Sequence, residues 1–216
     1  MQKIFILLLL IIQVGISTVL AQEPQQTETN QDQEFEVFPE QIEIVHMELG
    51  DSTLLQEIES TFNLARKTVK ELEVRQVKNN SIIEDGNKQI TSLNEFAKKL
   101  HDLVHVYYGG DTSKRAELLK FLKLDNSTND TALAIVINSR IEEMKLEGKI
   151  INNLQDKSIE QNIKDKKFCD ELIVLWKAVM RNMKLYFSEK DISKNDRENA
   201  KAELRELLTS INQLCD

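Results

Sequence analysis

The strongest constraint on the fold is an apolar run from Phe168 to Phe187, which contains the only tryptophan and one of two cysteines. Large apolar residues recur through it at spacings of three and four, the period of one helix face. They are Phe168, Leu172, Leu175, Val179, Met183 and Phe187, with Trp176 and Met180 widening the stripe. So wide a stripe is typical of a helix buried on more than half of its circumference. We therefore expect a central helix here, covered by the rest of the chain.

Residues that interrupt helices are rare, with two prolines and six glycines among 216 residues. The sequence therefore predicts a single all-α domain, an antiparallel helical bundle of five to six helices joined by short loops. The predicted helices are 51–72, 87–108, a short helix capped by Asp111 or Thr112, 131–156, 159–187 and 193–214. Loops are expected at 78–86, where Asp85 precedes Gly86, at 109–110, and at 125–130.

The first 21 residues have the composition of a secretory signal peptide. Lys3 precedes a short apolar region, and small residues stand near a cleavage point before Gln22. No later stretch has the roughly 18 uncharged apolar residues that a membrane helix needs. We therefore divide the chain into a signal peptide (1–21), an acidic, largely disordered tail (22–50) and a helical bundle (51–216), and expect a secreted, extracellular protein without membrane insertion.

Export makes a disulfide between Cys169 and Cys215 the expected state of the two cysteines. If the chain turns back near Ile192, the two cysteines lie equally far from the turn and come level in an antiparallel hairpin. The same register sets apolar residues of the central helix against apolar residues of the last one. On the chain-entropy argument such a bridge contributes about 4 kcal/mol. The alternative is two free buried thiols.

Charge is distributed unevenly along the chain. Residues 22–50 contain eight acidic residues and neither lysine nor arginine, while the helical body is near neutral. Such a body has no basic surplus to hold nucleic acid, whereas the tail could bind a basic partner. The tail also carries Phe35, Val37 and Phe38, so it could either lie as an extended strap across the bundle or stay free to bind another molecule.

Three Asn-X-Ser/Thr sequences predict a glycoprotein. The acceptor residues are Asn79, Asn126 and Asn129, and all three fall in predicted loops outside the apolar stripes. Because glycans are attached to surface asparagines of exported proteins, these sites agree with the predicted export.

No motif of high specificity indicates catalysis or a cofactor. His101 and His105 stand four residues apart, a spacing that suits a metal pair, but exposed surface histidines explain it as well. No serine lies in a glycine-flanked turn, and we expect the cysteines to be oxidised. The prediction is a protein that is not an enzyme and that has no metal site or cofactor.

The tail segment Phe35-Glu36-Val37-Phe38-Pro39-Glu40-Gln41-Ile42 resembles the acidic C-terminal segment of the leech hirudins, Phe-Glu-Glu-Ile-Pro-Glu-Glu-Tyr. The residues that match in type and spacing are Phe35, Glu36, Pro39 and Glu40. Phe38 and Ile42 are apolar where that pattern has Ile and Tyr, while Val37 and Gln41 replace acids. The resemblance covers eight residues. They lie toward the N-terminus of this chain, whereas the hirudin segment is C-terminal. It implies binding to a basic exosite of a coagulation protease, with charge steering and apolar anchors.

These features favour a secreted glycosylated helical protein that acts without catalysis by binding another macromolecule. It would be an extracellular effector or a signalling or immunomodulatory ligand, such as a component of saliva or venom, and its partner an extracellular protein such as a host receptor or protease. One alternative is a carrier of a small apolar ligand inside the bundle, lined by Trp176, Met180, Met183, Tyr186 and Phe187. The weaker alternative is coagulation-protease binding through the tail.

Overall fold

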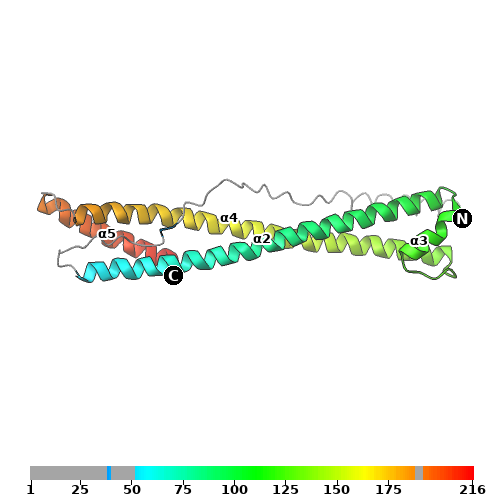
Figure 1. The fold of residues 1–216 in the computed structure, drawn as a ribbon, viewed down its shortest axis with the longest axis horizontal. Coiled ribbons are helices and arrows are strands. Elements are labelled where there is room, and N and C mark those ends of the chain that lie inside the picture. Colours follow the sequence, from blue (N-terminus) through cyan, green and yellow to red (C-terminus); the bar gives the residue numbers. More distant parts are fainter. Residues whose placement is uncertain (1–37, 40–51, 188–191) are drawn as a thin grey trace. The chain divides into compact units, whose positions relative to one another are not determined.

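A computed structural model describes residues 38–39, 52–187 and 192–216 of the chain. It contains the helices α2 (Ser52–Tyr108), α3 (Arg115–Phe121), α4 (Asp130–Tyr186) and α5 (Lys194–Cys215), and a 3-10 helix, η1 (Thr112–Lys114) (Figure 1). No residue in the described ranges is in a β-strand, so the all-α prediction is confirmed. The predicted signal peptide lies outside the described residues, and so does the predicted acidic tail except for Phe38 and Pro39.

Most helix ends fall where the sequence predicts them. Helix α2 ends before Gly109, and Gly110 adopts a left-handed φ of 111° that suits glycine. The Asp111 carboxylate caps η1 by accepting a hydrogen bond from the Ser113 backbone N–H at 3.0 Å. The Ser193 hydroxyl caps α5 in the same way, accepting from the Asp196 N–H at 3.1 Å.

Two predicted interruptions are wrong. The loop predicted at 78–86 lies inside α2, and the break predicted between 156 and 159 lies inside α4, so each of these helices is continuous over 57 residues. In the first of these segments, Asn79 bonds across to Asn162 of the facing helix, and Gly86 makes room for Gln155 of that helix. The local preference of Asn and Gly for turns is thus overridden by tertiary contacts.

The described residues group into two compact units, which we describe in turn. Unit 1 comprises Asn80–Ile159. Unit 2 comprises residues 38–39, 52–79, 160–187 and 192–216.

Unit 2 is a three-helix arrangement in which α5 runs back antiparallel along α4, with the first half of α2 packed against both (Figure 1). The stripe predicted for the central helix supplies much of its core. Its buried members are Leu172, Trp176, Val179 and Met183 in α4 and Phe187 directly after it, and α5 contributes Leu204, Leu208 and Ile211. The central helix and its hairpin with the last helix are therefore confirmed.

An aromatic cluster encloses the tryptophan of unit 2. The ring centroid of Trp176 lies 5.1 Å from that of Phe62 and 5.6 Å from that of Phe38. Phe38 also stacks on Phe62 at 5.6 Å and is only 7% exposed, although it precedes the helices in the chain. Aromatic pairs at this separation add to the stabilisation that burial alone provides. Phe38 is therefore a core residue of unit 2.

Buried polar contacts join α2 and α4 within unit 2. The Arg75 guanidinium donates two hydrogen bonds to the Asp165 carboxylate, both at 2.7 Å, and Gln161 donates a third at 2.8 Å. The hydrogen bond to Asp165 raises the pKa of Arg75. One turn further along α2, Asn79 Nδ2 donates to Asn162 Oδ1 at 2.8 Å. Such pairs disfavour other registers, because sliding one helix would leave buried polar groups unbonded.

Unit 1 is built on the second half of α2 and the first half of α4, with α3 packed at one end. Its core contains Leu100, Val104, Leu119, Leu133 and Ile137, among other residues. Arg115 holds the connection between α3 and α4, donating hydrogen bonds to the backbone carbonyls of Asn126 and Thr128 and to the Asp130 carboxylate. The loop predicted near 125–130 is confirmed as residues 122–129.

A buried glutamine explains the glycine at position 86. Gln155 is fully buried, and its Nε2 donates to the Ile83 carbonyl and to Asn87 Oδ1, both at 2.9 Å. A Cβ atom at Gly86 would lie 2.6 Å from the Gln155 side chain, closer than real Cβ contacts. Gly86 therefore makes room for a side chain of α4 and does not form the predicted turn.

None of the described helices has a segment apolar enough, over the length that a bilayer demands, to cross a membrane.

We expect Phe38→Ala to lower the free energy of unfolding by about 3 kcal/mol, because it removes a buried ring from the core. Trp176 emission should shift to longer wavelength and become more accessible to acrylamide. The matched control is Val174→Ala, two residues from Trp176 and 65% exposed, for which we expect a change within about 0.5 kcal/mol. Unchanged Trp176 emission in Phe38→Ala would contradict the packing described here.

We expect Arg75→Met to destabilise the protein by about 2 kcal/mol, because it leaves the Asp165 carboxylate buried without its main partner. The double variant Arg75→Met/Asp165→Leu should be closer to the wild type than Arg75→Met, since no buried charge remains. Urea unfolding of the two single variants and the double variant measures the coupling. Strictly additive effects would show that the two side chains do not interact.

Candidate binding groove

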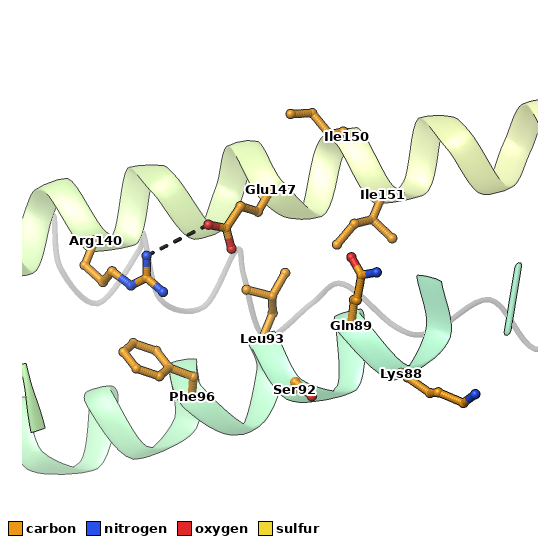
Figure 2. Close-up of a pocket in the computed structure, with 9 residues that line it drawn as sticks. All are labelled: Lys88, Gln89, Ser92, Leu93, Phe96, Arg140, Glu147, Ile150 and Ile151. Atoms are coloured by element: carbon orange, nitrogen blue, oxygen red, sulfur yellow. Dashed lines mark ion pairs between the residues drawn. The ribbon is translucent and has the colours of Figure 1, made fainter. Parts of the chain in front are cut away.

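An open groove of about 580 Å³ lies between α2 and α4 in unit 1. Figure 2 shows side chains of both helices along it. From α2 the groove is lined by Lys88, Gln89, Ser92, Leu93 and Phe96, and from α4 by Arg140, Glu147, Ile150 and Ile151.

The groove exists because the third helix of unit 1 is short. Helix α3 has seven residues and is therefore about 10 Å long, whereas the part of α2 in unit 1 extends for about 40 Å. It packs at the end of the unit, where Phe121 stacks on Phe96 with ring centroids 4.6 Å apart. Beyond that point no helix among the described residues of unit 1 covers this face of the α2–α4 pair.

The groove combines an apolar floor with a charged rim. Leu93 and Phe96 provide the floor on the α2 side and Ile151 on the α4 side, while Ile150, 52% exposed and directed away from α2 in Figure 2, lies at the edge of the groove. The Arg140 guanidinium lies 5.1 Å from the centroid of Phe96, within the range of a cation–π contact. Figure 2 shows Arg140 reaching toward Glu147, with 3.9 Å between nitrogen and oxygen. Arg140 also pairs with Glu143, at 2.8 Å. The rim is thus ordered around Arg140.

Helix α4 carries large apolar residues on its exposed side next to the groove. Leu146 is 61% exposed, Ile150 52% and Leu154 53%. Large apolar side chains gathered on one exposed face typically mark an interaction surface.

The groove is suited to accept apolar side chains from another molecule, with polar contacts at its edge. Sequence reasoning did not find it. The available signal was a surplus of apolar residues outside the inward stripe, because Leu146, Ile150 and Leu154 lie on a different helix face from Met144 and Ile151. Without the position of α3, this surplus could not be assigned to an exposed face.

The two histidines considered for a metal pair lie side by side on α2. Their ring centroids are 6.0 Å apart, and His101 Nδ1 lies 3.4 Å from an Asp102 carboxylate oxygen. Within the described ranges, His, Cys, Asp and Glu residues do not gather in any group of three or more that could hold a metal ion.

The predicted disulfide is not formed, and both Cys169 and Cys215 are free thiols of intermediate burial. Both face α2. Cys215 hydrogen-bonds with the Thr68 side chain, and Cys169 lines a cavity together with Val69 and Leu72. Counting along the hairpin placed the cysteines at one level but could not fix the direction of either side chain around its helix. Burial raises the pKa of both thiols.

The three predicted glycosylation sites have different surroundings. Asn126 and Asn129 are exposed in the loop between α3 and α4, where Asn129 Oδ1 also accepts a hydrogen bond from the Ala132 N–H at 2.9 Å. Asn79 is instead in α2, only 8% exposed, and its Nδ2 donates to Asn162. The loop predicted around Asn79 is wrong, and in this fold the nitrogen that would carry a glycan faces the helix α4.

Of the tail residues proposed for partner binding, Phe38 is buried in unit 2 and Pro39 is exposed. Phe35, Glu36, Glu40 and Ile42 lie outside the described residues. The packing of Phe38 favours the strap alternative over a free segment at this position.

The residues proposed to line a ligand cavity pack in the core of unit 2. Trp176, Met183 and Phe187 are buried there, with Met180 and Tyr186 packed against them. The cavity beside Cys169 has a volume of about 160 Å³, below the roughly 300 Å³ at which small-molecule pockets begin, and none of these five residues lines it.

Comparisons with protein-family models, with curated proteins and with solved structures found no match to this chain.

We expect alkylation of the denatured, unreduced protein to add two groups, one at each cysteine. In the folded protein the reaction should be slow at pH 8 and accelerate above pH 9, because the raised pKa values of the thiols keep the reactive thiolate scarce at lower pH. Mass spectrometry measures both quantities. A cysteine introduced at the exposed position Ser210 is the matched control and should react faster. Recovery of a linked Cys169–Cys215 peptide would contradict the structure.

Proposed function

We propose that this protein is a secreted glycoprotein that acts without catalysis, by binding an amphipathic segment of another extracellular protein in the groove of unit 1. The observation that carries the proposal is the apolar floor of the groove, formed by two facing helices and left open. An amphipathic helix laid into a groove of this kind inserts apolar residues at spacings of three and four.

The charged rim adds directional contacts for such a segment. Lys88 is 75% exposed at its side chain and Glu147 is 50% exposed, so both remain available to groups at the edge of a bound helix. Charges at the rim of an interface contribute mainly to association rate and to selectivity between partners. The extracellular setting rests on the composition of residues 1–21, and the glycans on the exposed acceptors Asn126 and Asn129.

The test is a selection of displayed helical peptides on the intact protein, followed by binding measurements on the variants Ser92→Arg and Ser81→Arg. Ser92 is an exposed groove residue, so an arginine there should fill the groove and weaken the selected peptides at least about tenfold. Ser81 lies three turns earlier on the same exposed face of α2, outside the groove, and should leave binding unchanged.

Fluorescence anisotropy of labelled peptides gives the dissociation constants, and far-UV circular dichroism confirms that both variants remain folded. Peptides that bind both variants as well as they bind the wild type would contradict the proposed groove.

A further inference from the structure

Helix α4 carries a short, exposed, self-complementary face within unit 1. Leu146, Ile150 and Leu154 follow one another at intervals of four residues and are more than half exposed. Glu143 precedes them by three residues and Lys157 follows them by three, and both of these are exposed. Because three- and four-residue steps keep to one side of a helix, the five residues share one face. We name these five residues the α4 stripe.

We propose that the α4 stripe binds a second copy of this chain, with the two α4 helices antiparallel about a two-fold axis at Ile150. In that register Leu146 faces Leu154 of the second copy, and Ile150 faces its own counterpart. Glu143, seven residues before Ile150, faces Lys157 of the second copy, seven residues after it. An isologous dimer needs a surface that is complementary to itself under this rotation.

Charge selects the antiparallel arrangement over the parallel one. In a parallel pair Glu143 would face Glu143 of the second copy, and Lys157 would face Lys157, so both ends of the stripe would repel. In the antiparallel pair both ends carry opposite charges. Glu143 already pairs with Arg140 but its side chain remains 58% exposed, and Lys157 forms no ion pair within the described part of the chain. Opposite charges at both ends therefore fix the register.

The symmetric spacing of the α4 stripe about Ile150 favours a second copy over an unrelated partner. Binding to an unrelated protein would not require the two leucines to stand at equal distances from Ile150. It would also not require opposite charges at equal distances from that residue. The interface is small, three apolar side chains and two charge pairs in about 21 Å of helix, so we expect a dimer with a micromolar dissociation constant.

The inference goes beyond the proposed function and shares with it Ile150 and, through the ion pair of Glu143 with Arg140, one contact at the rim of the groove. The floor residues Leu93 and Phe96 take no part in the α4 stripe, and the stripe residues Leu146 and Leu154 do not line the groove. Ser92→Arg should therefore leave self-association unchanged, so the failure of one proposal is distinguishable from the failure of the other.

The test is a charge exchange followed by sedimentation velocity of the intact protein across a wide concentration range. Glu143→Lys alone and Lys157→Glu alone each place like charges together at both ends, and should weaken the dimer by about tenfold. The double variant Glu143→Lys/Lys157→Glu should restore it. A mixture of the two single variants should also associate, because each supplies the charges that the other lacks.

Leu146→Gln/Leu154→Gln removes most of the apolar contact and should abolish the dimer, whereas Glu84→Lys, an exposed acid of α2 outside the stripe, should leave it unchanged. Far-UV circular dichroism verifies the fold of each variant. A wild-type protein that stays monomeric at every concentration, or a dimer that survives the loss of both leucines, would overturn the proposal. A double charge variant as weak as the single variants would overturn the antiparallel register.

Discussion

The pairing of α2 with α4 depends on polar side chains buried between two helices that are otherwise free of interruptions. Burying a carboxylate or an amide costs free energy unless its hydrogen bonds are satisfied. Unit 2 satisfies Asp165 with Arg75 and Gln161, and Asn79 with Asn162. In unit 1 the Gln155 amide bonds to a backbone carbonyl and to Asn87. These bonds are specific to one register, because an apolar contact tolerates a shift that a buried hydrogen bond does not.

The apolar pattern was sufficient to predict the helices and most of their buried faces. The stripe around Trp176 is the core of unit 2, and the capping residues Asp111 and Ser193 stand at the helix ends where their side-chain chemistry places them. These features are local or depend only on helical period, so they can be derived from one sequence. The hairpin of α4 and α5 follows as well, because few residues connect two helices with matching apolar faces.

Features that depend on the direction of a side chain or on a third element could not be derived. Asp85-Gly86 is typical of a turn, and only the position of Gln155 on the facing helix shows why glycine is needed inside α2. The cysteines were expected to lie level and to pair, yet each is directed toward α2 and both are free. The groove was missed because its openness results from the shortness of α3, which the sequence of α2 and α4 does not contain.

The loop between α3 and α4 has a consequence for how the chain could be divided. Residues 122–129 form a largely exposed loop that connects α3 to α4. Hydrogen bonds from Arg115 to two of its backbone carbonyls hold this loop in place. In both units α2 is packed against α4 by side chains alone. A proteolytic nick in this loop would therefore separate the chain into two fragments that stay together without a peptide bond between them, much as complementing halves of a split protein do.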